Sequence, residues 1–283
     1  MMLTYLDKRL TPPRDIEPIP AAICVPRLPL FNAPITDERV RQVTTALYGE
    51  AVEIYNQEDG FAYIRLTDDH YMGWVRAEGL QAPSSRPATH HLSAAMSFGF
   101  RDADIKSGIQ THLYLNSRLI LEEERGPLAY CQGLGWVPRC HLTPVNEYYE
   151  DPCAIAENFI ATPYLWGGND ASGVDCSGLI QIAFKACGLQ LPRDSDMQFA
   201  WSGNVVPDWQ NADKLRRNDL VFWQGHVGIL QDASTLLHAN ATHMAVSCEP
   251  LQDAIERIQD TYSLPLGVKR LALDGLNSKP WKG

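Results

Sequence analysis

The sequence predicts a multidomain chain in which two small β-rich domains precede an α+β domain. Residues 21–146 contain short runs rich in β-branched and aromatic side chains, separated by Gly, Asn and Asp, which is typical of strands. Within this region a pattern of about sixty residues occurs twice, and each copy closes on Gly-Trp-Val. After Pro144 helical segments come first and strand-like runs follow, an order that favours an α+β domain.

Composition limits the classes of partner. The chain of 283 residues has 24 basic and 34 acidic side chains, a net charge of −10, which argues against nucleic acid or an anionic membrane as partner. No run approaches the ~18 apolar residues of a membrane span, and no secretory signal is visible. The seven cysteines are odd in number and contain no CxxC pair, unlike a disulfide framework or a structural zinc site. We expect a reduced, cytoplasmic protein without metal or cofactor.

The N-terminal half is predicted to hold an arm and two similar domains. Residues 1–20 are rich in proline and are expected to form an extended arm. The two copies cover 21–82 and 83–146, and "GWVRAEGL" of the first matches "GWVPRCHL" of the second. Both copies resemble bacterial SH3-like β-barrels, because a Gly-Trp pair lies near the last strand of each.

The third domain, residues 147–283, contains a cysteine at a predicted helix start. Asp151 followed by Pro152 predicts an earlier helix, which Pro163 would end. A glycine-rich loop then leads to Cys176, and the apolar pattern predicts a helix over 176–187. A cysteine at a helix N-terminus meets unpaired N–H groups, which favour the thiolate. Because free cysteines are often only packing residues, catalysis needs partners elsewhere in the chain.

Two histidines in strand-like runs are the candidate partners. His226 opens "HVGIL" and His238 lies in "TLLHAN". If a hairpin turn centres on Asp232, the two histidines oppose each other directly, close enough for one imidazole to orient the other. A thiol nucleophile needs a base, and the base needs an orienting group, so Cys176, His226 and His238 fill these roles. The same trio could instead bind a metal, although it lacks a short-spaced ligand pair.

These residues occur in ordered motifs. "YLWGG…DCSGLI", "NDLVFW…GHVGI" and "LLHA" together resemble the NlpC-type murein cysteine peptidases, which are papain-like. The resemblance implies a papain-like fold for 147–283 and a γ-D-glutamyl–diamino acid endopeptidase activity. It assigns Cys176 as nucleophile, His226 as base and His238 as the orienting residue. Tyr164 is expected to donate its hydroxyl to the oxyanion, and such a donor can contribute ~3–4 kcal/mol.

The two SH3-like copies narrow the resemblance to cytoplasmic dipeptidyl-peptidases that recycle murein peptides such as L-Ala-γ-D-Glu-diaminopimelate. In that group the first barrel helps to recognise the free amine of the substrate. The resemblance implies that Glu50 and Tyr71 do so together with Asp175 and Ser177. Carboxylates would hold the ammonium by charge-assisted hydrogen bonds. A pocket closed behind it would release dipeptides.

The internal repeat gives a second reason to single out the first barrel. Glu50 corresponds to Asn116 in the second copy, and Tyr71 to Gly133, so the acidic and phenolic side chains are confined to the first copy. Asp175 also has an alternative interpretation, as the N-cap of the helix that begins at Cys176.

"LPRDSDMQ" at 191–198 also recurs in the family, so Asp194 and Ser195 are expected to contact substrate, and Arg193 to bind a substrate carboxylate. An Asp-Ser pair is equally typical of a helix cap. Carboxylates near Cys176 raise its thiol pKa, yet we expect the imidazolium–thiolate pair to prevail. The competing hypotheses are an amidase or acyltransferase on the same scaffold, and a non-catalytic cell-wall-binding protein.

Overall fold

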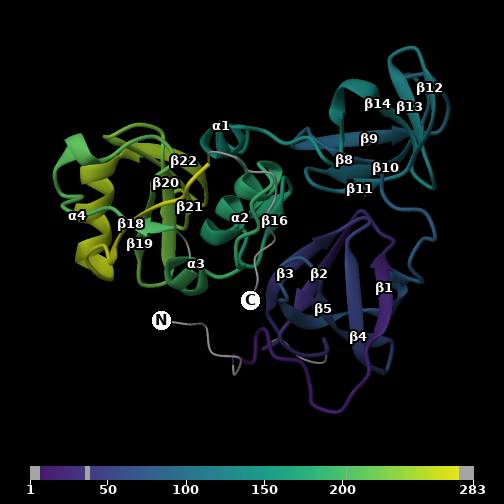
Figure 1. Cartoon of the computed structure of the whole chain (residues 1–283), viewed down its shortest axis with the longest axis horizontal. Helices are drawn as coiled ribbons and strands as arrows, with labels where there is room; N and C mark the ends of the chain where they lie inside the picture. Colours follow the sequence, from purple (N-terminus) through teal and green to yellow (C-terminus); the bar gives the residue numbers. More distant parts are fainter. Residues whose placement is uncertain (1–6, 36–38, 202, 274–283) are drawn as a thin grey trace. The chain divides into compact units, whose positions relative to one another are not determined.

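The protein divides into two compact units. The computed structural model describes residues 7–35, 39–201 and 203–273, so residues 1–6 of the predicted arm lie outside the described residues. One unit ends at Tyr148 and the other begins at Tyr149, two residues beyond the predicted boundary. Figure 1 shows the elements of both units.

The N-terminal unit begins with an antiparallel sheet. Its described strands follow the order β3-β2-β6-β5-β4-β1-β7. In β2, Leu28 and Leu30 are buried while Arg27 and Pro29 are half-buried, the period of two that a sheet with one buried face requires. The strands are β1 (Ile19–Ile23), β2 (Arg27–Phe31), β3 (Gln42–Leu47), β4 (Ala51–Glu58), β5 (Phe61–Leu66), β6 (Met72–Arg76) and β7 (Leu80–Gln81).

A second group of strands follows in the same unit. They form two sheets, ordered β10-β9-β14-β13-β12 and β11-β8-β15, around a core that includes Leu92, Leu113 and Leu119. The strands are β8 (His90–Leu92), β9 (Met96–Phe100), β10 (Ile109–Tyr114), β11 (Arg118–Leu119), β12 (Leu121–Arg125), β13 (Leu128–Cys131), β14 (Gly135–Pro138) and β15 (Leu142–Pro144).

The two groups end alike, as the internal repeat predicts. Each Gly-Trp-Val strand, β6 or β14, leads into a 3-10 helix and then a short strand. The 3-10 helices are η1 (Ala77–Gly79) and η2 (Arg139–His141). The groups also touch, because Arg118 binds both carboxylate oxygens of Asp68 at 2.8 Å.

The C-terminal unit combines helices with a six-stranded antiparallel sheet of order β18-β23-β19-β20-β21-β22 and a two-stranded sheet of β16 and β17, as the α+β prediction requires. The predicted runs at 219–223, 226–231 and 235–240 form β19, β20 and β21. The helices are α1 (Pro152–Glu157), α2 (Cys176–Ala186), α3 (Ser195–Trp201), η3 (Ala212–Lys214) and α4 (Leu251–Thr261). The strands are β16 (Asn169–Asp170), β17 (Gly173–Val174), β18 (Asn204–Val205), β19 (Leu220–Trp223), β20 (His226–Leu230), β21 (Thr235–Asn240), β22 (Ala245–Pro250) and β23 (Gly267–Arg270).

Local signals set the ends of the helix that carries the cysteine. Asp175 caps α2 by accepting a hydrogen bond from the Gly178 N–H at 2.7 Å. The helix ends at Ala186, and Gly188 has φ +80°, the left-handed conformation that glycine adopts most readily. Both features confirm the predicted helix. Asp151 likewise caps α1, but α1 ends at Glu157, well short of Pro163.

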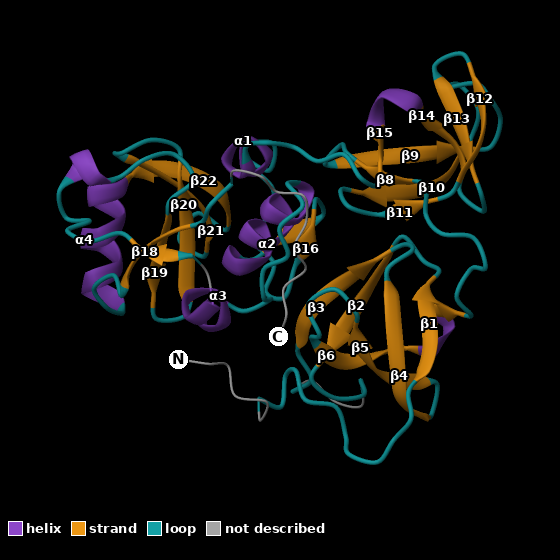
Figure 2. Ribbon diagram, viewed as in Figure 1, coloured by secondary structure: helices purple, strands orange, loops and turns teal. Residues whose placement is uncertain are grey.

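The sheet of this unit lies between two helices (Figure 2). Helix α2 packs against β20 and β21, whereas α4 packs against β21 and β22. Leu251, Ala254 and Ile258 of α4 recur at helical spacing and pack with Leu236 of the sheet. Full burial of such a leucine or isoleucine stabilises the fold by about 1.5–3 kcal/mol. Neither β22 nor α4 was predicted from the sequence.

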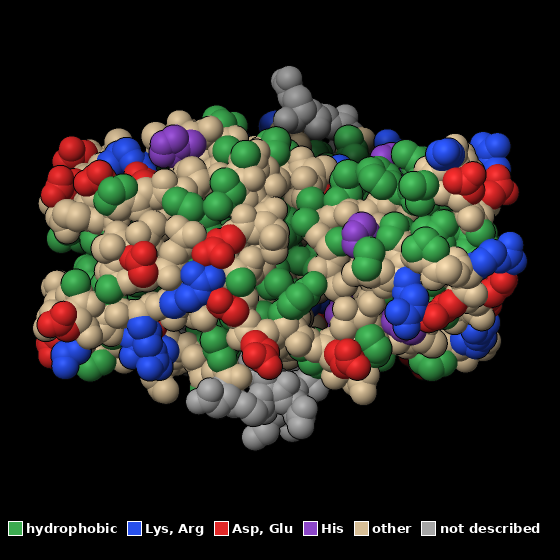
Figure 3. Space-filling model, turned by 90° about the horizontal axis from the view of Figure 1, so that it is seen from above, with side chains coloured by type: hydrophobic (Ala, Val, Ile, Leu, Met, Phe, Trp, Pro, Cys, Tyr) green, Lys and Arg blue, Asp and Glu red, His purple; other side chains and the backbone are tan. Residues whose placement is uncertain are grey.

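Acidic and basic side chains are interspersed on the face drawn in Figure 3, with hydrophobic side chains between them. None of the helices in the described ranges is long and apolar enough to cross a membrane.

Candidate active site

Cys176 is the first residue of α2 and is 7% exposed. Its thiol lies 3.9 Å from the carbonyl oxygen of Gly225, and the backbone N–H groups of Val227 and Ser177 face the sulfur. Gly225 and Val227 flank His226 in the chain. The N-terminus of α2 therefore holds the thiol against the start of β20, where the predicted base is located.

His226 and His238 form a hydrogen-bonded pair. His226 Nε2 lies 2.8 Å from His238 Nδ1, and the two rings are inclined at 63°. Their predicted opposition is wrong, however. Leu230 pairs with Leu236, so the register is shifted by two residues and His238 lies opposite Gly228. The turn is longer than predicted. The Gln231 N–H donates to the carbonyl of Thr235, so the turn closes between these two residues.

The shifted register still brings the histidines together. A shift by two residues keeps both side chains on one face of the sheet, and diagonal neighbours remain within reach of large side chains. Gly228 leaves the space that this arrangement needs. A Cβ at position 228 would lie 3.1 Å from His238 Cβ and 2.7 Å from Leu236 Cδ1.

Burial controls the protonation of the thiol and its base. It raises the pKa of Cys176 to about 12, with the Asp175 carboxylate as the next cause. Burial, followed by His238, lowers the pKa of His226 to about 3. Both shifts favour the neutral thiol and the neutral imidazole. The burial of both groups therefore opposes the expected imidazolium–thiolate pair.

Tyr164 lies beside the thiol. Its backbone N–H donates to the carbonyl of Met244 at 2.9 Å, and it bridges to Val174, two residues before Cys176. Burial raises the pKa of its phenol, and the nearby Cys176 and Asp175 raise it further. The hydroxyl therefore stays protonated near neutral pH, as an oxyanion donor must.

Asp175 is held by a buried arginine. Its two carboxylate oxygens accept from the Arg193 guanidinium at 2.9 and 2.7 Å, and also from the N–H groups of Gly178 and Gly167. Arg193 donates to Ser177 Oγ as well, at 2.9 Å. The prediction that Arg193 binds a substrate carboxylate is wrong, because its side chain is 0% exposed. The roles of Asp175 and Ser177 towards a substrate amine stay predictions.

Glu50 and Tyr71 belong to the N-terminal unit. Glu50 is 7% exposed and accepts from the Leu47 N–H at 2.9 Å, in the turn between β3 and β4. Tyr71 is 4% exposed and directly precedes β6. Arg118, from the second group of strands, lies close enough to Glu50 to interact with its charge. Their joint role with Asp175 stays a prediction.

Asp194 and Ser195 mark the start of α3. The carbonyl of Asp194 accepts from the Gln198 N–H at 2.8 Å, and Ser195 is the first residue of the helix. The alternative that this pair begins a helix is confirmed, while its contact with substrate stays a prediction.

Glu249 and Arg257 were missed by the sequence analysis. His238 Nε2 lies 2.6 Å from Glu249 Oε1, and the Arg257 guanidinium pairs with the same oxygen. Glu249 is on β22 and Arg257 on α4. The helical spacing of Leu251, Ala254 and Ile258 was the signal in the sequence that could have predicted α4. A helix predicted there would have made Arg257, on its polar face, a candidate.

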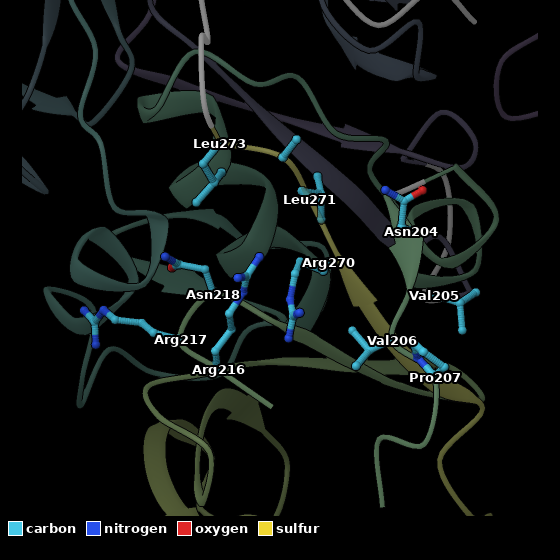
Figure 4. A pocket seen from close by; sticks show the side chains of 11 residues that line it. Asn204, Val205, Val206, Pro207, Arg216, Arg217, Asn218, Arg270, Leu271 and Leu273 are labelled. Carbon is cyan, nitrogen blue, oxygen red and sulfur yellow. The ribbon is translucent and has the colours of Figure 1, made fainter. Parts of the chain in front are cut away.

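A cavity of about 450 Å³ lies elsewhere in this unit, between β18, β23 and the loop before β19 (Figure 4). None of the predicted site residues lines it. Two of its three arginines are already paired, Arg217 with Asp151 and Glu157, and Arg270 with Asp219. No three His, Cys, Asp or Glu side chains within the described ranges are placed to hold a metal ion.

Comparison with known sequences accounts for this geometry. Residues 161–262 match the sequence model of the NlpC/P60 family. The chain carries an NlpC/P60 domain. Cys176, His226, His238 and Tyr164 all fall within it. Residues 30–80, which include Glu50 and Tyr71, match the bacterial dipeptidyl-peptidase Sh3 domain. That match ends before the second group of strands, so a second SH3-like domain stays a prediction.

Among curated proteins, the chain is similar to the gamma-D-glutamyl-L-lysine dipeptidyl-peptidase of Bacillus subtilis (strain 168). The two are 26% identical over 232 residues, covering 75% of this chain and 77% of the relative. It is also similar to dipeptidyl-peptidase 6 of Lysinibacillus sphaericus, at 28% identity over 40% of each chain.

Two solved structures share the fold. An NlpC/P60 family protein from Bacillus cereus ATCC 10987 superposes with a TM-score of 0.75 and 19% identity, covering 89% of this chain and 99% of that one. An NlpC/P60 endopeptidase from Photobacterium damselae subsp. piscicida superposes with a TM-score of 0.61 and 14% identity, covering 96% and 76%. The first likeness spans both units, so an N-terminal SH3-like region followed by an NlpC/P60 domain is the architecture of this chain.

Proposed function

We propose that the protein is a cysteine peptidase that hydrolyses the γ-D-glutamyl–diamino acid bond of murein peptides with a free N-terminal L-Ala. It would release L-Ala-D-Glu in the recycling of cell-wall peptides. One observation carries the proposal: the Cys176 thiol lies against the backbone that flanks His226, and His226 is hydrogen-bonded to His238. The name of the Bacillus relative, a gamma-D-glutamyl-L-lysine dipeptidyl-peptidase, supports the substrate class. The name of the Lysinibacillus relative, dipeptidyl-peptidase 6, supports the release of dipeptides.

We expect hydrolysis to proceed in the following steps. Cys176 Sγ attacks the γ-carbonyl carbon of D-Glu while its proton passes to His226 Nδ1, the ring nitrogen that His238 does not engage. The resulting oxyanion accepts hydrogen bonds from the Tyr164 hydroxyl and from backbone N–H. His226 then returns the proton to the leaving amine, and the C–N bond breaks to leave a thioester. Water, deprotonated by His226, hydrolyses the thioester and frees L-Ala-D-Glu and the thiol.

Recognition of the free amine is the second part of the proposal. Glu50 and Tyr71 would bind the ammonium of L-Ala together with Asp175 and Ser177, and Asp194 and Ser195 would contact the rest of the dipeptide. The match of residues 30–80 to a dipeptidyl-peptidase Sh3 domain supports a role for Glu50 and Tyr71. Asp175 is already paired with Arg193, and Glu50 would add a second carboxylate that attracts the ammonium.

Digestion of synthetic tripeptides tests both parts. L-Ala-γ-D-Glu-diaminopimelate and its N-acetyl derivative are incubated with the protein, and product masses are recorded. We expect L-Ala-D-Glu from the free peptide only. Cys176→Ala should abolish the reaction, whereas Cys140→Ala, which removes an exposed cysteine, should not. Hydrolysis by the Cys176→Ala protein would refute the peptidase, and equal turnover of both peptides would refute amine recognition.

A further inference from the structure

The hydrogen-bonded chain that starts at the base continues beyond the histidine pair. His226 Nε2 contacts His238 Nδ1 at 2.8 Å, and His238 Nε2 contacts Glu249 Oε1 at 2.6 Å. Arg257 binds that same carboxylate oxygen. Three adjacent strands, β20, β21 and β22, each supply one member of this chain, and α4 supplies the last.

The register of β22 explains why Glu249 reaches His238. Ser247 pairs with His238, and Glu249 pairs with Leu236, so Glu249 is the diagonal neighbour of His238 on the same face. Helix α4 begins directly after β22 and carries Arg257 back to the carboxylate. Arg257 is held in turn by Thr242, whose Oγ1 accepts from its Nη1 at 2.9 Å.

Burial makes these contacts costly to lose. The side chain of His238 is 0% exposed and that of Glu249 is 12% exposed. A carboxylate in such surroundings needs hydrogen-bond donors, and His238 and Arg257 provide them. The hydrogen bond from His238 lowers the pKa of Glu249, so the carboxylate is ionised near neutral pH. Burial lowers the pKa of His238 itself, so this imidazole is neutral there.

An ionised carboxylate fixes where the protons of both rings lie. It only accepts, so the proton of neutral His238 must be on Nε2. Its Nδ1 is then bare and accepts the Nε2–H of His226. Neutral His226 consequently has a bare Nδ1, the one atom that can take the proton of the Cys176 thiol. Without Glu249, His238 could carry its proton on Nδ1, which would turn the Nε2 of His226 into an acceptor and block its Nδ1.

We propose that Glu249, held by Arg257, is a positioning residue that sets the tautomers of His238 and His226 so that His226 can act as the base. Its negative charge also stabilises the imidazolium that forms on His226 during attack. This inference rests on the proposed function of Cys176 and His226. The competing interpretation is an ion pair that only fastens α4 to β22.

Glu249→Gln is the first variant, because glutamine keeps the size and removes the charge that fixes the tautomer. Glu256→Gln is the matched control, since Glu256 is an exposed residue of α4 with the same charge. With the free tripeptide, we expect kcat of Glu249→Gln to fall about 10- to 100-fold, as activity falls when a residue that orients a metal-bound histidine is lost. KM should change less than twofold, and the control should match wild type.

A spectroscopic measurement tests the tautomers without substrate. In Cys176→Ala protein labelled with ¹⁵N-histidine, the imidazole shifts of His226 and His238 should report the Nε2–H form of both rings at pH 7. Adding Glu249→Gln should produce a mixture of tautomers, and adding Glu256→Gln should not. If wild type cleaves no murein peptide yet the tautomers depend on Glu249, the proposed function fails while the inference stands. Unchanged tautomers and unchanged kcat in Glu249→Gln would overturn the inference.

Arg257→Gln provides a second variant should Glu249→Gln fail to fold. It removes the clamp that holds the carboxylate against His238, so we expect part of the Nδ1–H tautomer to appear and kcat to fall less than tenfold. A loss of stability with unchanged tautomers and unchanged kcat in Arg257→Gln would favour the purely structural ion pair.

Discussion

Two arginine–carboxylate pairs flank the candidate active site. They differ in which other hydrogen-bond donors each carboxylate accepts from. Asp175 beside Cys176 is bound by Arg193, and both its oxygens also accept backbone N–H groups. Glu249 is paired with Arg257 and also accepts a hydrogen bond from His238. Asp175 thus holds together the loop and the helix on which Cys176, the candidate nucleophile, lies. Glu249 contacts His238, which contacts His226, the candidate base. Similar pairs therefore lie on the two sides of the candidate active site and make different contacts.

The largest effect, a fall in kcat, is expected from replacing His238, which lies between Glu249 and His226. His238→Ala should lower kcat by about 10³- to 10⁴-fold, because losing the group that orients a catalytic imidazole has a cost of that order. Steady-state kinetics on the free tripeptide measures it. The protein should remain folded by circular dichroism. A loss below tenfold would mean that neither His238 nor Glu249 orients the base.

On the other side, Asp175→Ala should lower the free energy of unfolding by about 3–5 kcal/mol, because Arg193 would remain buried without its counter-charge. Urea unfolding followed by tryptophan fluorescence gives the value. Asp213→Ala, which removes an exposed aspartate from the same unit, is the control and should change stability by less than about 0.5 kcal/mol. If both variants unfold alike, the pair of Asp175 with Arg193 does not stabilise the fold.

The histidines between the two pairs should make stability depend on pH. His226 titrates near 6.5 in an unfolded chain and at about 3 in the folded protein. Between these values the unfolded chain binds the proton and the folded protein does not. The stability that neutral His226 contributes to the free energy of unfolding is fully present above about pH 6.5. It is lost as the pH falls towards 3, by up to about 1.4 kcal/mol per pH unit. Urea midpoints at pH 4 to 7 should vary less in His226→Asn than in wild type, and equal slopes would contradict the buried neutral base.

The smallest effect sharpens the difference between the carboxylates. Because Asp175 is already paired with Arg193, the proposal assigns part of the attraction for the substrate amine to Glu50. Glu50→Gln is expected to raise KM about tenfold for the free tripeptide, since a hydrogen bond to a charged group is worth about 1.5–3 kcal/mol, and to leave kcat nearly unchanged. Glu58→Gln, an exposed residue of the same sheet, is the control. An unchanged KM would mean that Glu50 does not bind the substrate amine, and would leave Asp175 as the candidate.

Features fixed by neighbouring residues were predictable from the sequence. The caps at Asp151 and Asp175 and the glycine stop at Gly188 depend on contacts within a few positions, and the structure confirms them. The pairing of His226 with His238 was predicted for the right reason but in the wrong register. The two histidines still meet, because an error of two residues leaves both side chains on the same face of the sheet.

Features set by contacts across the fold were not predictable in this way. Arg193 binds Asp175, eighteen positions away in the sequence, and its buried guanidinium also donates to Ser177 and to the carbonyl of Gly168. Glu249 reaches His238 only through the register of β21 and β22. A charged residue in a short strand carries no sign of its partner, so its function became visible only when the strands were in place.

Gly228 shows how the site can be impaired at a position without any reactive atom. Replacing it with alanine would keep the nucleophile, both imidazoles and Glu249. The added methyl group would still press on Leu236 and His238, and a displacement of a few tenths of an ångström is enough to strain a 2.8 Å hydrogen bond. An engineer grafting the three reactive side chains onto another hairpin would therefore also have to copy the empty space opposite the second histidine.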